Sequence, residues 1–203
     1  MITRVLSATA ILVLLAGVLA GCDGDSSELQ RVVCEVQMVN AGVPLLSAYV
    51  VDGGDGIIGG AEPDDSYPAD AVMVNFSARP YSRSVMTIPN DDTYSSYIIT
   101  GYNLTWVPGG NAPAGLDLSP YNVTNAPFYL QVPINDEAMG SVLIADRSLK
   151  EALGGALGLP WGFDQDFSAV AHLQFIGHDS GSSHESVIES GLYVNFTFAL
   201  SSD

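Results

Sequence analysis

Residues 167–200 have the sequence FSAVAHLQFIGHDSGSSHESVIESGLYVNFTFAL, and this segment decides the fold class. Apolar side chains occupy alternate positions from Phe167 to Phe175 and again from Leu192 to Leu200. An alternation with a period of two residues is typical of a β-strand that buries one face. The intervening residues 177–186 are mostly small or polar and indicate a long hairpin loop. The segment is therefore predicted to form two paired antiparallel strands.

The same alternation occurs in six further segments that are rich in Val, Tyr, Phe and Thr. These segments are 31–38, 43–51, 71–78, 94–107, 127–132 and 141–145, and clusters of Gly, Pro, Asn, Asp and Ser separate them. Within 94–107 the pattern predicts that Ile98 shares a face with Tyr102 and Leu104. A short helix is predicted over 147–157. About eight antiparallel strands predict an all-β, two-sheet sandwich that forms one domain over residues 31–203.

The first 21 residues have the pattern of a secretory signal. Arg4 carries the only charged side chain before Cys22, and Val5–Leu19 is almost wholly apolar. This stretch is shorter than the roughly 20 apolar residues that a membrane-spanning helix needs. It ends in the sequence LAGC at 19–22, which resembles the lipobox of bacterial lipoproteins. The resemblance implies a signal peptide over 1–21, a lipid on Cys22 and a flexible tether over 22–30.

Such a lipid determines where the protein is expected to reside. Several acyl chains (palmitate, for example) on one residue give stable membrane anchoring, whereas one chain binds only marginally. The resemblance therefore implies a lipid-anchored protein of the bacterial cell envelope. Asp23, directly after the lipidated residue, favours the inner membrane in enteric bacteria. Either membrane, on its periplasmic or surface side, remains open.

The strand pattern also resembles the immunoglobulin-like and fibronectin-type-III-like domains of bacterial envelope lipoproteins. The similarity rests on the long strand Tyr97–Trp106, the hairpin over 167–200 and the secretory context. It implies an immunoglobulin-like sandwich that acts as an adhesion, scaffold or partner-binding module. The Cys–Trp–Cys core of antibody domains is not present in the sequence. A fold alone does not determine a function.

Charge and cysteine content exclude several classes of protein. The 203 residues include 23 Asp and Glu but only 6 Lys and Arg, which gives a formal net charge of −17. Nucleic-acid binding is excluded because Lys and Arg are needed to neutralise phosphate. The chain has few of them, and Lys150 is its single lysine. Two cysteines cannot build a disulfide framework. With Cys22 lipidated, Cys34 has no partner and is predicted to be a small buried apolar residue beside Val32 and Val36.

An acidic, glycine-rich segment over 53–70 is the longest one without a strand pattern. Calcium prefers six to eight oxygen ligands, and this segment offers several carboxylates. The sequence thus suggests a Ca²⁺ site and, with it, an alternative function as a Ca²⁺-dependent carbohydrate-binding or adhesin module. The candidate ligands are Asp52, Asp55, Glu62, Asp64, Asp65 and Asp70.

Two histidines flank the hairpin loop and form a second candidate metal site. His178 and His184 are neighboured by Asp179 and Glu185, and the two ends of a hairpin loop approach each other. Imidazole and carboxylate groups together suit Zn²⁺ or Cu²⁺. The spacing matches no established ligand motif, so solvated loop residues are the alternative interpretation.

No catalytic motif stands out in the sequence. The chain has no Gly-x-Ser-x-Gly elbow, phosphate-binding loop or dinucleotide fingerprint. A pair of carboxylates that acts in hydrolysis is defined by its spatial separation, so a hydrolase with a carboxylate site stays an alternative. The leading hypothesis is a non-enzymatic envelope module that binds a protein or glycan partner or has a structural role.

Overall fold

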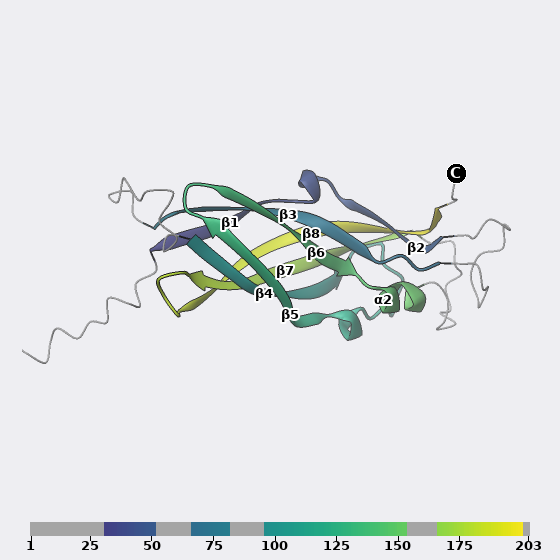
Figure 1. The fold of residues 1–203 in the computed structure, drawn as a ribbon. Helices are drawn as coiled ribbons and strands as arrows, with labels where there is room; N and C mark the ends of the chain where they lie inside the picture. The colour runs from purple at the N-terminus through teal and green to yellow at the C-terminus, as the bar shows by residue number, and fades with distance from the viewer. Residues whose placement is uncertain (1–30, 52–65, 82–95, 154–165, 201–203) are drawn as a thin grey trace, which may run out of the picture.

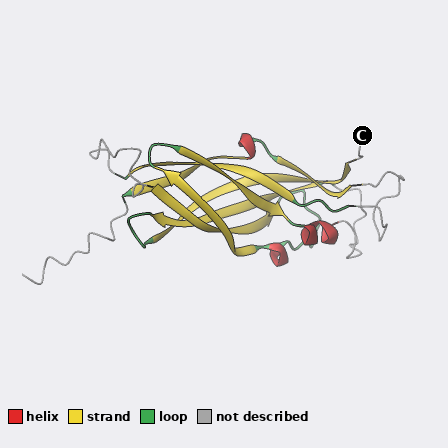
Figure 2. Ribbon diagram, in the orientation of Figure 1, coloured by secondary structure: helices red, strands yellow, loops and turns green. Residues whose placement is uncertain are grey.

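The computed structural model describes residues 31–51, 66–81, 96–153 and 166–200. Eight strands make up most of this part of the chain, with two single 3-10 turns and one short helix (Figures 1 and 2). The strands are β1 (Val32–Val39), β2 (Leu45–Val51), β3 (Asp70–Pro80), β4 (Ser96–Pro108), β5 (Val123–Pro133), β6 (Glu137–Ala145), β7 (Phe167–Asp179) and β8 (Glu185–Leu200). The turns are η1 (Asn40–Gly42) and η2 (Ser119–Tyr121), and the helix is α2 (Arg147–Glu151).

The strands form two sheets, which confirms the predicted all-β sandwich. One sheet has the order β1-β3-β6 and the other the order β2-β8-β7-β4-β5. In immunoglobulin-like domains strands A, B and E share one sheet and C, F and G the other. Strands β1, β3 and β6 have the first arrangement, and β4, β7 and β8 have the second. The expectation of purely antiparallel strands is wrong for one pair, because β2 runs parallel to β8.

The core lies between the two sheets and is built from the alternate residues of each strand. Every second side chain of β7 from Phe167 to Phe175 is buried, as predicted. Phe175 meets Phe76 of the opposite sheet edge to face, with 4.9 Å between ring centroids. Phe196 stacks on Phe167 at 4.9 Å and also contacts Trp106. Each such fully buried side chain stabilises the fold by about 1.5–3 kcal/mol.

The predicted face of β4 is wrong at one residue. Tyr97 and Ile99 are buried, whereas Ile98 is only half-buried and pairs with His178 on the outer side of the sheet. The register shifts between Ile99 and Gly101, where a bulge inserts an extra residue. A bulge reverses the inside–outside phase of a strand, so simple alternation assigns the residues before it to the wrong face.

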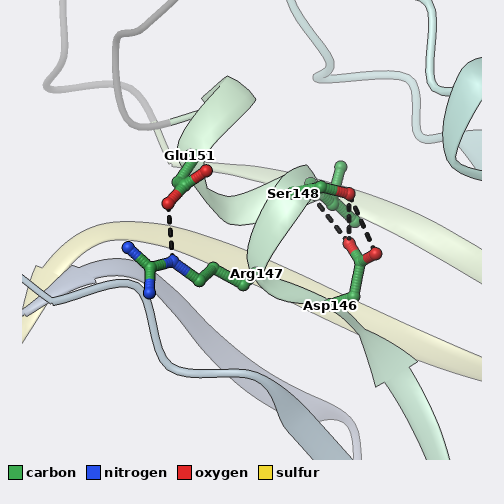
Figure 3. A network of polar contacts seen from close by, with 5 residues as sticks. Asp146, Arg147, Ser148 and Glu151 are labelled. Atoms are coloured by element: carbon green, nitrogen blue, oxygen red, sulfur yellow. Dashed lines mark hydrogen bonds and ion pairs between the residues drawn. The ribbon is translucent and has the colours of Figure 1, made fainter.

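The short helix α2 begins where the sequence predicts it. Asp146 is its N-cap residue, and its Oδ1 accepts a hydrogen bond from the Leu149 amide at 2.8 Å. Ser148 donates to the same carboxylate, and Arg147 pairs with Glu151 one turn later at 2.6 Å (Figure 3). Such a cap contributes about 1 kcal/mol. The described helix ends at Glu151, and most of the predicted remainder lies outside the described residues.

The two ends of the sandwich are formed by different parts of the chain. Arg31 and the hairpin loop after Asp179 lie at one end. Val51 pairs with Leu200 at the other end, where the described part of β8 finishes (Figure 1). The 16 residues of β8 span about 50 Å at the rise of an extended strand. The first and last described residues therefore lie at opposite ends of an elongated body.

Candidate functional site

Asp179 forms a buried, hydrogen-bonded polar centre at the end of the sandwich where Arg31 lies. Its side chain is 1 % exposed, although it stands next to the hairpin loop. Oδ2 accepts hydrogen bonds from the backbone amides of Arg31 at 2.7 Å and Val32 at 3.0 Å. Oδ1 accepts from the Gly181 amide at 2.9 Å. One carboxylate thus joins the start of β1 to the β7–β8 hairpin.

The residues of the predicted histidine site have other partners in the structure. His178 and Glu185 are register partners across the hairpin, and His178 Nδ1 lies 2.9 Å from the Asp179 carbonyl oxygen. His184 is exposed in the loop, with its amide bonded to Ser182. Asp179 points inward to the backbone amides. Among the residues that the structure describes, no group of three or more His, Cys, Asp or Glu is placed to hold a metal, and the Zn²⁺ or Cu²⁺ site stays a prediction.

Lys150 and Asp70 form a second buried polar centre, at the opposite end. The Lys150 side chain is fully buried, and its Nζ lies 2.7 Å from Asp70 Oδ2. It also donates to the Ala48 carbonyl oxygen. Because Lys150 is on α2, Ala48 on β2 and Asp70 on β3, the ammonium group joins three elements. Burial of an unpaired ammonium is costly, and this pair compensates the charge.

The predicted Ca²⁺ ligands fall into two groups. Asp70, the one described member, is engaged by Lys150. The others, Asp52, Asp55, Glu62, Asp64 and Asp65, lie outside the described residues, as does Cys22. The described residues on either side of 52–65 are Val51, the last residue of β2, and Ser66, which precedes β3. The Ca²⁺ site therefore stays a prediction, and Asp70 has a different partner in the described structure.

Cys34 is buried in the core beside Val32, as the sequence predicts. The pKa of its thiol is raised from 9.0 to about 12, chiefly by burial; a hydrogen bond with the Glu35 backbone lowers it, and the nearby Glu35 charge raises it. The thiolate is the nucleophilic and metal-binding form of cysteine. The thiol therefore stays protonated and unreactive at neutral pH.

The raised pKa of Cys34 predicts a loss of stability in alkali. Between pH 9 and 12 the unfolded chain loses the thiol proton while the folded chain keeps it, so stability falls as pH rises through this window. At pH 10.5 the loss is about 2 kcal/mol relative to pH 9. Urea unfolding at several pH values measures it, with Cys34→Ala as the control that removes this part of the slope. Parallel pH profiles for the two chains would contradict the assignment.

Sequence patterns missed the roles of both buried polar centres, although signals for them exist. Asp179 occupies the same alternating face as Phe167 and Phe175, which marks it as an inward residue. Lys150 lies between the apolar residues Leu149 and Ala152, both of which are buried. Charged residues are almost never fully buried unless paired, so their partners had to be found in space.

Among the residues that the structure describes, no helix is both long and apolar enough to cross a bilayer. Comparisons with models of protein families, with curated proteins and with solved structures found no match for this chain.

Proposed function

We propose that the protein is a non-enzymatic, lipid-anchored module of the bacterial cell envelope that presents its sandwich to a protein or glycan partner. The observation that carries this proposal is the position of Arg31 and Val32, which Asp179 holds at one extreme end of the body. A lipid on Cys22 would attach to that end through the tether over 22–30. The end with Val51 and Leu200 would then face away from the bilayer.

Chain dimensions set how far the module would project from the membrane. A nine-residue tether extends at most about 30 Å. The sandwich adds about 50 Å along β8. The far end would therefore reach at most about 80 Å from the lipid. A reach of this size suits recognition of a partner beyond the headgroup layer.

Because the protein is strongly negative, the lipid would be its main anchor to the membrane. Removal of residues 1–21 would take away Arg4 and no acidic residue, which leaves a net charge of −18. Anionic headgroups attract basic segments and repel acidic ones. Electrostatic attraction therefore does not hold the module at the membrane, whereas acyl chains contribute about 0.8 kcal/mol for each buried CH₂ group.

The buried ionisable groups support a binding or structural role. Asp179, the Lys150–Asp70 pair and Cys34 all lie inside the sandwich or between its elements. Asp179 and Lys150 are engaged by backbone groups of neighbouring strands, and the Cys34 thiol is held protonated. A catalytic acid, base or nucleophile must instead reach a substrate. These groups serve the architecture of the sandwich.

The anchoring half of the proposal is tested with Cys22→Ala. Wild type expressed in a bacterial host with lipoprotein-processing enzymes is expected in the membrane fraction, and Cys22→Ala in the soluble fraction. The physical reason is that the variant loses every acyl chain while keeping a net charge that disfavours the bilayer. Cell fractionation followed by immunoblotting measures the distribution.

Cys34→Ala is the matched control, since it removes the other cysteine and is expected to remain with the membrane. A Cys22→Ala chain that stays membrane-bound would overturn the anchoring proposal. Cross-linking of the anchored wild type in intact cells tests the second half of the proposal. Reproducible absence of any cross-linked species would count against partner binding.

A further inference from the structure

Three methionines gather on the outer face of the β1-β3-β6 sheet. Met38 is 46 % exposed, Met73 49 % and Met139 65 %, and each comes from a different strand. The whole chain contains five methionines, of which one is Met1. Large apolar side chains normally point into a sandwich, so three exposed thioethers on one small sheet are an unexpected concentration. This methionine cluster (Met38, Met73 and Met139) has no role in the proposed anchoring.

The register of the sheet centres the cluster on Asn75. Met38 of β1 and Met139 of β6 both pair directly with Asn75 of β3, one from each side. Neighbouring strands are about 4.8 Å apart, so the two methionine backbones are about 10 Å apart across β3. Met73 stands two residues before Asn75 on the same strand and the same face. Three rotatable bonds in each methionine allow the sulfurs to swing together over this point.

A β-bulge is responsible for the position of Met38. The register of β1 against β3 shifts between Val36 and Met38. Without this shift Met38 would follow Val32 and Cys34 onto the inner face, but instead Val39 is buried and Met38 is exposed. Bulges re-aim side chains and are enriched beside functional sites. The chain thus departs from regular pairing at the residue that completes the cluster.

Asn75 supplies a second observation at the centre of the cluster. Its Nδ2 donates a hydrogen bond to Glu137 Oε2 at 2.8 Å. Its Oδ1 is covered, yet accepts no hydrogen bond from any residue that the structure describes. Covered acceptors in folded proteins nearly always have a partner, so an unmatched one requires an explanation. Oδ1 is the negative end of this amide, and the Glu137 carboxylate lies beside its Nδ2. Both add negative potential that favours a cation near the methionines.

We propose that the methionine cluster binds one Cu⁺ ion through the thioether sulfurs of Met38, Met73 and Met139. Soft thioether ligands select Cu⁺, whereas Ca²⁺ and Mg²⁺ require oxygen ligands and Zn²⁺ prefers thiolate, imidazole or carboxylate. The net charge of −17 adds a general attraction for cations. The site is separate from Cys34, whose buried thiol faces the opposite side of β1, and it does not depend on the lipid anchor.

Competition with a chelator tests the site in the detergent-solubilised full chain. Cu⁺ is supplied anaerobically as its coloured bicinchoninate complex, and loss of colour reports transfer to the protein. The expected result is transfer of one equivalent to wild type. Met38→Leu, Met73→Leu and Met139→Leu should each weaken the apparent affinity at least tenfold, and the triple variant should take up none. Leucine keeps the apolar volume but removes the sulfur.

A control variant and a second readout make the result specific. Cys34→Ala should bind Cu⁺ as wild type does, because the Cys34 thiol is buried in the core on the other face of β1. Ag⁺, a redox-stable substitute, should shift the methyl NMR signals of Met38, Met73 and Met139. Thermal melts should show that the leucine variants stay folded. Absence of transfer to wild type, or undiminished transfer to the triple variant, would overturn the proposal.

Discussion

Replacement of Asp179 by Ala is expected to lower the free energy of unfolding by about 3–5 kcal/mol. The change removes a buried carboxylate that accepts three backbone hydrogen bonds, from Arg31, Val32 and Gly181. Hydrogen bonds to a charged group contribute more than neutral ones, and a buried amide without a partner carries the cost of its desolvation. The start of β1 should also lose its attachment to the hairpin. Urea unfolding followed by circular dichroism measures the effect.

Asp117→Ala provides the matched control. The Asp117 carboxylate also accepts a backbone hydrogen bond, from Ser119 at 2.9 Å, but the residue is exposed. Water replaces the lost partner there, so the expected loss is much smaller than that of Asp179→Ala. Asp179→Asn should fall between wild type and Asp179→Ala, because its amide oxygen still accepts. If Asp179→Ala and Asp117→Ala lose similar stability, Asp179 does not hold the strands together.

Breaking the Lys150–Asp70 pair from either side should be the other large effect. Asp70→Asn leaves a buried ammonium without its counter-charge and is expected to cost about 3–5 kcal/mol. Lys150→Met keeps most of the volume but leaves the Asp70 carboxylate unpaired. Its expected cost is smaller, about 2–4 kcal/mol, because the Asp70 side chain is 21 % exposed and water can reach it. Chemical denaturation of both variants measures the two values.

The double variant Asp70→Asn/Lys150→Met distinguishes a true pair from two separate residues. Once both charges are gone, neither carries the penalty of an absent partner. The double variant should therefore be more stable than the sum of the single losses predicts, by at least about 1 kcal/mol. Additive losses would show that the 2.7 Å contact contributes no coupling energy.

The strands were predictable because each one buries a single face. From Phe167 to Phe175 the inner side chains alternate without interruption, and in β3 the buried residues Val72, Val74 and Phe76 do the same. The hydrophobic effect acts on each strand separately, so a one-dimensional pattern contains the information. The parallel pairing of β2 with β8 was not predictable, since pairing partners depend on the whole topology.

A bulge accounts for the wrong face predicted for Ile98, which precedes a shift in register. A second shift puts Met38 on the face opposite to the one that continued alternation from Val32 and Cys34 gives. A single inserted residue reverses every later assignment, and no sequence pattern marked these two positions. The methionine cluster could not be predicted from the sequence, because simple alternation places Met38 in the core.

The buried charges were missed for a different reason. Asp179 lies on a predictable inner face, but two of its three hydrogen-bond donors are backbone amides almost 150 positions earlier in the chain. Lys150 reaches Ala48 across 102 positions. Such partners come together only when both sheets have formed. Sequence alone therefore predicted the layers of the sandwich but not the contacts that fasten its ends.

The central claim, a lipid-anchored envelope module, is tested most directly by the mass of the N-terminal tryptic peptide. Trypsin cuts after Arg31, so processing before Cys22 yields the peptide CDGDSSELQR over residues 22–31. Protein purified from bacterial membranes should give this peptide with the added mass of acyl chains and with a Cys22 thiol that resists alkylation. An unmodified peptide that begins upstream of Cys22, or a Cys22 thiol that alkylates freely, would contradict the account.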